Sequence, residues 1–535
     1  MESSQETTKK PPPATIDIKL PKGFNVTTVT EYVSELKAFL ISPLVESLIL
    51  AHPNEVAIEG GMNSIGESDG HWWDWVARVD SGNRAALIDS LVHSASDQTT
   101  HRDMELHPSL GQLISHTTQL RLPRASDIHG VDPTPTERCG AGMSPKKAHE
   151  VNRLSSLIDR IYSTSIRDPN RLIVDVGAGQ GYLSHRLAQH PGTHVLALDG
   201  DEGQTEGATL RGQGLSHAER QRVRNREDHP TDDRDTNSRL VAPVTHRTLF
   251  ITSDSLLHAV DEWIGSLDNP EALPRPVLVT GLHACGSLTP AVLRCFIRLC
   301  THPNQVTCRK KKWAPAALAL VGCCYNLMRN ADDFPLSETT TRTDPHISLN
   351  LTPNHLQLAA QCPAQWSRSK SEMERASLAR RKIVWRAILA RCIHESSSSS
   401  NTIPNRLGRL PDRVYADWGS FVQTACEKMK LPSTATEELL VGSSKSEGRS
   451  VLPSGAETLA FQLEVLHILR AIIGPVIESL IILDRTLYLA EQLDSNNGSP
   501  TFTVRALNLF DQLSSGSARN VVLIVDPINE QTQHT

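Results

Sequence analysis

The clearest strand signal in the chain is a short run over residues 172–176, apolar at all but one position. It is rich in β-branched side chains and lacks the alternation of a half-exposed strand, so it predicts a strand buried on both faces of a parallel sheet. Gly177, Gly179 and Gly181 end the run, and residues 182–189 have the pattern of a helix. Strand, glycine turn and helix together predict the first half of a nucleotide-binding crossover, with the ligand at the carboxyl end of the strand.

Later segments continue the alternation of strand and helix. Short apolar runs predict four further strands, at residues 194–198, 248–253, 276–280 and 316–322. After a long interval, the chain closes with an apolar helical stretch at 461–493 and two strands at 504–510 and 520–525. Strands that alternate with helices predict an α/β fold built around a mostly parallel sheet.

The remainder of the chain is helical or polar. Amphipathic spacing predicts helices near the N-terminus and again at 356–366, 373–393 and 418–429. Charged residues dominate 201–245 and serines recur after 395, so these stretches are predicted to be insertions without packed structure. The expected division is an N-terminal helical region with an irregular linker at 1–142, the first part of the core at 143–330, a helical insertion with disordered serine-rich segments at 331–455, and the rest of the core at 456–535.

Composition and charge narrow the class of protein. The net charge of −6 over 535 residues excludes bulk attraction to a phosphate backbone, although a local basic surface is compatible with it. Ten cysteines without a C-x-x-C pair indicate reduced thiols, and the first residues lack the apolar segment of a secretory signal. No uninterrupted apolar run reaches about 18 residues. We therefore expect an intracellular protein, cytoplasmic with the nucleus as the alternative, that has no membrane partner; its protein partners are unknown.

The residues around the glycine turn indicate which nucleotide binds. Asp199 follows the predicted strand at 194–198, about twenty residues beyond the turn, where a carboxylate can accept hydrogen bonds from both ribose hydroxyls. The turn has the spacing G-x-G-x-G with Asp175 before it in the strand, unlike the G-x-G-x-x-G turn of dinucleotide-binding proteins. This pattern resembles the first motif of the S-adenosylmethionine-dependent methyltransferases.

That resemblance implies S-adenosylmethionine as the cofactor. It implies that Asp175 orders the turn and contacts the methionine amine through it, while Asp199 holds the ribose. By position, Asp254 is expected to follow the third strand and meet the adenine amino group. Lys147, in the first turn of the helix before the glycine strand, is expected to cover the cofactor, with a solvated helix entry as the alternative. The expected cofactor-binding set is Asp175, Gly177, Ala178, Gly179, Gly181, Asp199, Asp254 and Lys147.

Six segments extend the resemblance from about residue 143 onward. In chain order they are MSPKKAHEV, VDVGAGQGYLS, GLHACGSLT, VGCCYNL with FPLS soon after, RLGRLP, and GPVIESLIILDRTLYLAE. On these segments the chain resembles the methyltransferase-like 25 family, which includes proteins named for a ribosomal RNA adenine dimethylase-like domain. The resemblance implies a class I methyltransferase fold, with a Rossmann-like, mostly parallel sheet and an antiparallel last strand.

The family does not determine the methyl acceptor. The D/N-P-P-Y/F tetrapeptide of adenine-amino methyltransferases is absent, and GLHACGSLT and GCCYNL stand in that region instead. These two segments resemble counterparts in transfer RNA ribose methyltransferases. RNA, modified on a base or a ribose and bound through a local surface, is therefore the favoured substrate and partner. Two alternatives are a protein methyltransferase and a catalytically inactive cofactor-binding subunit of a complex.

The ends of the fourth and fifth predicted strands carry His283, Cys285, Cys323 and Cys324. His283 is the candidate proton acceptor for transfer to a hydroxyl or amine, with a structural histidine as the alternative. Nitrogen and sulfur ligands from adjacent loops suit tetrahedral zinc. The spacing is unlike a zinc knuckle, however, because H-x-C crowds two ligands together and adjacent cysteines rarely point at one centre. The sequence therefore predicts a metal-free cleft wall.

Overall fold

The computed structural model divides into two compact units. The sheet unit comprises Met1–Ser34, Leu122–Asn350 and Glu478–Thr535, and the helical unit comprises Glu35–Arg121 and Leu351–Ile477. The residues that the structure describes are 16–62, 71–95, 105–127, 143–212, 243–267, 274–301, 313–344, 347, 349–396, 407–431, 433–440, 443–446, 449–494 and 502–528.

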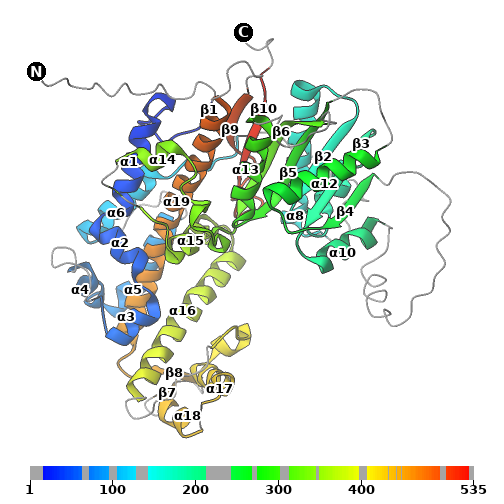
Figure 1. The fold of residues 1–535 in the computed structure, drawn as a ribbon. Helices are drawn as coiled ribbons and strands as arrows, with labels where there is room; N and C mark the ends of the chain where they lie inside the picture. Colours follow the sequence, from blue (N-terminus) through cyan, green and yellow to red (C-terminus); the bar gives the residue numbers. More distant parts are fainter. Residues whose placement is uncertain are drawn as a thin grey trace, which may run out of the picture. The chain divides into compact units, whose positions relative to one another are not determined.

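An eight-stranded sheet forms the centre of the sheet unit, in the order β1-β9-β10-β6-β5-β2-β3-β4 (Figure 1). Its strands are β1 (Ile16–Ile18), β2 (Arg171–Val176), β3 (Thr193–Asp199), β4 (Val244–Thr248), β5 (Arg275–Cys285), β6 (Trp313–Cys323), β9 (Phe502–Asn508) and β10 (Val521–Pro527). Only β10 among these strands runs against the others, because it pairs antiparallel with both β6 and β9. The expected mostly parallel sheet with an antiparallel last strand is therefore confirmed.

Helices cover both faces of this sheet (Figure 1). They are α8 (Pro145–Ile161), α9 (Tyr182–Leu187), α10 (Glu202–Gly212), α12 (Ser253–Ser266) and α13 (Leu288–Thr301). The sheet unit also contains the short α14 (Glu338–Arg342). The apolar stripe of α8, which includes Val151, Leu154 and Ile158, is buried in one cluster with Ile173 of β2 and Leu278 of β5. Ser144 caps this helix by accepting a hydrogen bond from the Lys147 amide. The core thus fixes α8 against the strands that flank the glycine turn.

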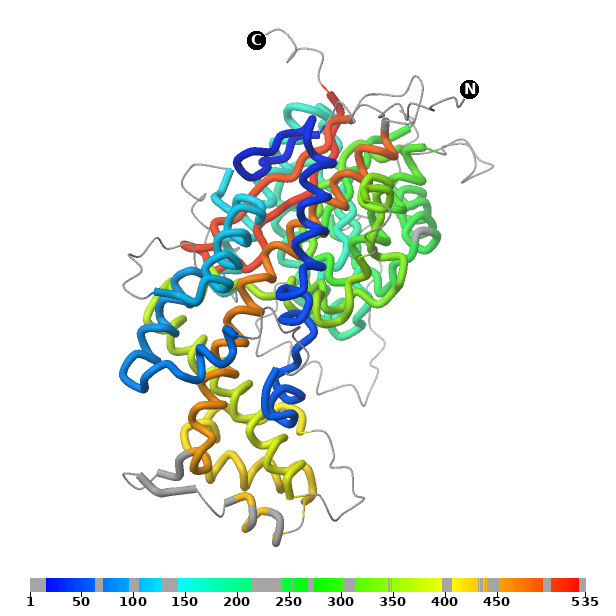
Figure 2. The backbone as a smooth tube through the Cα atoms, turned by 90° about the vertical axis from the view of Figure 1, so that its left-hand side faces the viewer, coloured from blue at the N-terminus to red at the C-terminus, as the bar shows by residue number. Residues whose placement is uncertain are grey.

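The helical unit joins segments that are far apart in the sequence (Figure 2). Early helices are α1 (Val29–Leu40, which begins in the sheet unit), α2 (Pro43–Leu50), α3 (Pro53–Glu59), α4 (His71–Ala77), α5 (Ser81–Ala95) and α6 (Pro108–Leu120). Later elements are α15 (Pro353–Ala359), α16 (Lys370–Ser396), α17 (Trp418–Met429), α18 (Ser433–Leu440), β7 (Ser443–Ser446), β8 (Arg449–Pro453) and the first part of α19 (Glu457–Asp494). On α19, Arg470 donates to the Leu48 carbonyl and Gln462 to the Trp73 carbonyl. The early helices therefore pack on the same long helix as the insertion.

This arrangement differs from the expected division of the chain. The region 1–142 is not one helical domain, because β1 pairs with β9 at the edge of the sheet and residues 35–121 belong with the insertion. The stretch 201–245 is not an insertion throughout, since α10 forms and buries Ala208. Likewise β7 and β8 form a hairpin where the serine-rich pattern predicted no structure. Residues 213–242 and 397–406 lie outside the described part of the chain.

Within the described part of the chain, one helix has the length and composition of a membrane span. Residues 457–493 of α19 include an 18-residue window with a mean hydropathy of 1.9, and 94% of that window is buried inside the fold. Its apolar side chains therefore face protein, as in the core helix of a globular fold. Glu478, which interrupts the apolar run in the sequence, is itself buried.

Gly474 of α19 is required for the packing of α15. A Cβ atom built on Gly474 would lie 2.4 Å from the carbonyl oxygen of Leu358, where neither backbone can yield freely. Gly474→Ala is therefore expected to destabilise the helical unit by about 1–3 kcal/mol. Gly111 of α6 is the matched control, because no atom lies within 4 Å of its Cβ position. There the same change should stabilise the unit by about 0.5–1 kcal/mol. Thermal unfolding of both variants checks the contrast, and equal effects would contradict it.

Candidate active site

The glycine turn after β2 is packed at both ends and open in the middle. Gly177, Gly179 and Gly181 have φ angles of +67°, +54° and +69°, which favour glycine. A Cβ atom at Gly177 would lie 3.3 Å from the His283 carbonyl oxygen, and one at Gly181 would lie 3.0 Å from Ala208. At Gly179 no atom lies within 4 Å of the Cβ position. The turn therefore offers space for a ligand at Gly179.

Asp175, in the strand before this turn, is hydrogen-bonded to the helix that follows it. It is 1% exposed, and its Oδ2 accepts a hydrogen bond of 2.6 Å from the Ser184 hydroxyl on α9. Burial raises the pKa of Asp175 to about 7, against the opposing effect of the Ser184 hydrogen bond. The strand acid thus ties β2 to the glycine helix, as the resemblance implied. Ser184 was not expected from the sequence, although a hydroxyl nine residues beyond a strand acid is a signal that could have indicated it.

Asp199 faces the turn from the end of β3. Its Oδ2 accepts a hydrogen bond of 2.8 Å from the Gly179 amide, and its Oδ1 accepts one of 2.9 Å from the Asp201 amide. The Ala178 amide donates to the Leu198 carbonyl, so the turn is joined to β3 a second time. A carboxylate has about four acceptor positions, so two such bonds orient Asp199 and leave capacity for ribose hydroxyls.

Lys147, in the first turn of α8, lies against the glycine helix. Its Nζ is 5.2 Å from the centroid of the Tyr182 ring. Arg211 of α10 covers the same ring and donates a hydrogen bond of 2.7 Å to the Tyr182 hydroxyl. Side chains of α8 and α10 thus converge on the first residue of α9, which follows the turn. Contact between Lys147 and the cofactor stays a prediction.

Asp254 does not follow a strand, which corrects the expectation from the sequence. The strand β4 ends at Thr248, and Asp254 lies in the first turn of α12, where it pairs with Arg298 at 2.6 Å. Asp254 lies in a helix and not at the end of a strand because Thr252 and Ser255 form a capping box that starts α12. Phe250 takes the strand-end position instead and is 83% exposed; the amide of its neighbour Leu249 donates to the Asp199 carbonyl. The strand was placed too late in the sequence because β4 reads VTHRT, which lacks the apolar run that marks the other strands of the crossover.

His283 lies at the cofactor edge with protein groups at both ring nitrogens. Its Nε2 is 3.5 Å from Oε2 of the buried Glu150, and its Nδ1 is 4.0 Å from the Cys323 sulfur. Glu150 also accepts a hydrogen bond of 2.6 Å from the Ser517 hydroxyl. Burial would raise the pKa of Glu150, but the contacts with His283 and Ser517 outweigh it and lower that pKa. This geometry places the imidazole between a carboxylate and a thiol, and its role as a proton acceptor stays a prediction.

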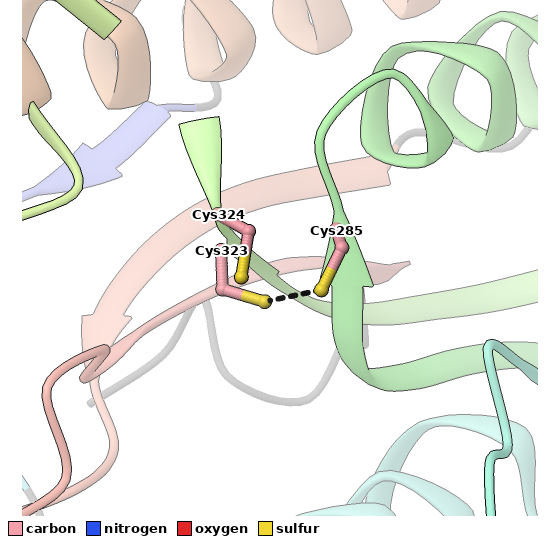
Figure 3. A group of neighbouring side chains, drawn as sticks. All are labelled: Cys285, Cys323 and Cys324. Carbon is pink, nitrogen blue, oxygen red and sulfur yellow. Dashed lines mark hydrogen bonds between the residues drawn. The ribbon is translucent and has the colours of Figure 1, made fainter. Parts of the chain in front are cut away.

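Three cysteines gather beside this histidine (Figure 3). The sulfurs of Cys285 and Cys323 are 3.1 Å apart, and the sulfurs of Cys285, Cys323 and Cys324 all lie within 4.8 Å of one another. The cause is strand register, since Cys285 of β5 pairs with Cys323 of β6. The hydrogen bond from the Cys323 thiol lowers the pKa of Cys324 to about 5, and the hydrogen bonds with Cys285 and Cys324 raise the pKa of Cys323. The expected neighbourhood of the two strand ends is confirmed.

A buried ionic cluster supports the β6 end of the site. Glu478 accepts hydrogen bonds from Arg519 at 2.7 Å, Arg124 at 3.0 Å and the Tyr325 hydroxyl at 3.1 Å. Burial would raise the pKa of Glu478, but the two guanidinium groups outweigh it and lower that pKa. The sequence suggested for Glu478 only that it interrupts an apolar helix. Its partners lie more than 40 residues away on either side, so no local pattern could have shown the cluster.

Comparison with known proteins agrees with this geometry. A family described as "Methyltransferase domain" matches residues 146–331. The human protein named "Probable methyltransferase-like protein 25" is 25% identical over 279 residues, covering 50% of this chain and 39% of that protein. Its mouse counterpart is 24% identical over 265 residues, covering 48% and 37%. The chain thus spans about two fifths of the length of the curated relatives it matches.

Among solved structures, "Crystal structure of Coclaurine N-Methyltransferase (CNMT) bound to N-methylheliamine and SAH" overlaps 93% of this chain and 98% of that chain. The sequence identity is 11% and the TM-score is 0.19. The domain match and the curated relatives confirm the resemblance drawn from the six segments. Together with the strand order they confirm a class I methyltransferase fold with S-adenosylmethionine as its cofactor. The open turn at Gly179 and the oriented carboxylate of Asp199 fit that cofactor.

Cofactor affinity is expected to depend on the protonation of Asp175. In the free protein its pKa is raised to about 7, so the carboxyl group is largely protonated at pH 6. The methionine ammonium group favours the carboxylate, so binding displaces a proton and should tighten by up to roughly eightfold from about pH 6 to about pH 7.5. Asp175→Asn should lose this dependence, as measured by calorimetry at both pH values. An equal pH dependence in that variant would contradict the assignment.

The same shift predicts the opposite trend for the stability of the free protein. Folding raises the pKa of Asp175 above its ordinary value, so the folded state binds this proton more tightly. The resulting stabilisation is present below the ordinary pKa and is lost as the pH rises through about 7.

Proposed function

Since the chain carries a class I methyltransferase domain like that of the methyltransferase-like 25 proteins, we propose that it transfers the methyl group of S-adenosylmethionine to RNA. Methyl transfer is supported by three features of the cofactor site: the buried Asp175, the open turn at Gly179 and the oriented Asp199. What favours RNA is the likeness of GLHACGSLT and GCCYNL to strand-end segments of transfer RNA ribose methyltransferases. These segments are compatible with methylation of a ribose hydroxyl and with methylation of a base.

Methyl transfer depends mainly on alignment of the methyl donor with the acceptor atom. Methyl transfer is an in-line displacement, and holding both reactants in the reacting geometry supplies a large part of the rate enhancement. When bound, the cofactor supplies an activated methyl group. Asp199 and the Gly179 turn would hold its nucleoside, and Asp175 would keep the turn in place. The acceptor would enter beside the ends of β5 and β6, where His283 and Cys324 are partly exposed.

The surface of the sheet unit offers suitable groups for RNA despite the net negative charge. Arg329 is exposed, and its amide donates to the Ser287 hydroxyl in the loop after β5, close to the strand ends. Exposed Phe250, at the Asp199 side, presents an aromatic face on which a base can stack. Arginine contacts to phosphate and aromatic stacking together are the usual means of holding a single-stranded RNA segment.

Methyl transfer from labelled cofactor to fractionated cell RNA and protein tests this proposal. The wild-type chain should label RNA and the Asp199→Ala variant should not, and the labelled nucleosides after nuclease digestion distinguish ribose from base. Label in protein alone would show a protein methyltransferase. Cofactor binding with no label in either fraction would show an inactive cofactor-binding subunit. Either of these two results overturns the proposal.

A further inference from the structure

The ends of β5 and β6 bring together four side chains of the kinds that bind zinc. Cys285 and Cys323 are paired in register, so both project from the same face of the sheet. Their sulfurs are 3.1 Å apart and point toward each other, with the Cys324 thiol beside them (Figure 3). His283, two residues before Cys285, places its Nδ1 4.0 Å from the Cys323 sulfur.

The backbone conformation at Cys324 allows two adjacent cysteines to face one metal ion, which adjacent residues of a regular strand seldom do. Cys324 has a φ of +48° and a ψ of +51°, a left-handed conformation that costs a non-glycine residue about 1–2 kcal/mol. The turn at this residue ends the strand alternation, so the Cys324 sulfur lies with the other two instead of on the opposite face. Gly286 holds the neighbouring loop close, since a Cβ there would lie 2.5 Å from the Leu327 backbone. Both loops are therefore fixed around the sulfurs.

A buried carboxylate lies beside the outer nitrogen of His283. Glu150 is 3% exposed and lies 3.5 Å from Nε2 of His283, while its other oxygen accepts the Ser517 hydroxyl. Histidines that bind a metal usually donate their second ring N–H to a carboxylate or carbonyl, which fixes the tautomer and leaves the other nitrogen as the ligand. Here the arrangement directs the lone pair of Nδ1 toward the cysteines.

We propose that Cys285, Cys323, Cys324 and Nδ1 of His283 bind one zinc ion in a closed tetrahedral site. With zinc–sulfur bonds of about 2.3 Å, ligand sulfurs lie about 3.8 Å apart. The observed spacing of 3.1 Å between Cys285 and Cys323 therefore needs to open by less than an ångström. Nδ1 of His283 is 4.0 Å from the Cys323 sulfur but lies outside the group of three sulfurs within 4.8 Å of one another, so the imidazole has to move toward Cys285 and Cys324 when the ion binds. When zinc binds, the three thiols lose their protons to solvent and bind the metal as thiolates. No redox step is involved. Four protein ligands leave no open position, so the ion has a structural role and joins β5 to β6 beside the cofactor turn.

A disulfide between Cys285 and Cys323 would account for less of the structure. It would use neither Cys324, which is held in a left-handed conformation, nor the contact between His283 and Glu150. A zinc ion uses all of them, and with both ring nitrogens engaged His283 would not be the proton acceptor of methyl transfer. The proposal is independent of the methyl acceptor, because metal content is measured without substrate or cofactor.

Elemental analysis of the full chain, purified without added metal and with any affinity tag removed, tests the proposal. We expect about one zinc per chain in the wild type, nearly complete loss in Cys323→Ser, and full retention in Cys392→Ser, a half-buried cysteine of α16 outside the cluster. Glu150→Gln should keep the stoichiometry and weaken zinc affinity by roughly tenfold or more. Removal of zinc by a chelator should lower the thermal midpoint of the wild type, and added zinc should restore it.

Cobalt substitution of the wild type keeps the test valid where a variant does not fold. Co²⁺ in this site should show thiolate-to-cobalt charge transfer and the intense visible bands of tetrahedral geometry. Wild-type protein that contains no zinc and gives no such spectrum would overturn the proposal. So would a Cys285–Cys323 disulfide found by mass spectrometry in metal-free protein, or zinc retained in the folded Cys323→Ser variant.

Discussion

Binding of S-adenosylmethionine is expected to be lost in Gly179→Arg and weakened at least roughly tenfold in Asp199→Ala. The Cβ position of Gly179 faces open space, so an arginine displaces no protein atom and its side chain fills the room left for the ligand. Asp199→Ala removes the ribose acceptor and also the acceptor of the Gly179 amide. Calorimetry gives the affinities, and circular dichroism shows whether each variant is folded.

Gly179→Ala is the matched control for the first variant. It carries the same penalty for a left-handed φ of +54° but adds only a methyl group, so it should bind more tightly than the arginine variant. Asp199→Asn retains a carbonyl acceptor without the charge and should fall between wild type and Asp199→Ala. Undiminished affinity in folded Gly179→Arg would place the cofactor elsewhere.

Glu478→Ala is expected to destabilise the sheet unit by about 3–5 kcal/mol, because it leaves buried charges without their partner. Arg124 and Arg519 have side chains that are 11% and 10% exposed, and both donate to this carboxylate. The Tyr325 hydroxyl, directly after the cysteine pair, loses its acceptor as well. Chemical denaturation monitors the loss, and metal content and cofactor affinity should decline with it.

Two variants separate this effect from a general effect of removing a glutamate. Glu206 of α10 is exposed, and Glu206→Ala should change stability by no more than about 0.5 kcal/mol. Glu478→Gln keeps acceptors for some of the donors and should be less destabilising than alanine. A negligible change in Glu478→Ala would show that the cluster has no net stabilising role.

The cofactor half of the site could be predicted from the sequence because its determinants are local. Asp175, the glycine turn and the helix after it follow within a few residues, and their spacing carries the geometry. Asp199 was predictable because it ends the next strand of the same crossover. In each case a short stretch of chain has few ways to satisfy a buried strand and a tight turn.

The other half depends on contacts between distant residues. Glu150 meets His283 across 133 positions, and Ser517 reaches Glu150 from 367 positions away. No periodicity links such residues, so the sequence supports only the approximate neighbourhood of the strand ends. The prediction for Asp254 was wrong for a different reason. A side-chain cap at Thr252 starts a helix there, and the hydrophobic pattern does not show whether a strand continues or a helix begins at that residue.

The strand order has a consequence for synthesis of the chain on the ribosome. β1 at Ile16–Ile18 pairs with β9 at Phe502–Asn508, and β6 finds its partner β10 about two hundred residues later. Until the last strands emerge, the nascent protein exposes the unpaired edge of β6, and its first strand has no place to dock. Pairing across such sequence separations is slow, because a long loop must close before the contact forms. The cofactor crossover, by contrast, is complete once β5 has been made. We therefore expect the cofactor-binding half to form early during translation and the sheet to be vulnerable to aggregation until the C-terminal hairpin seals it.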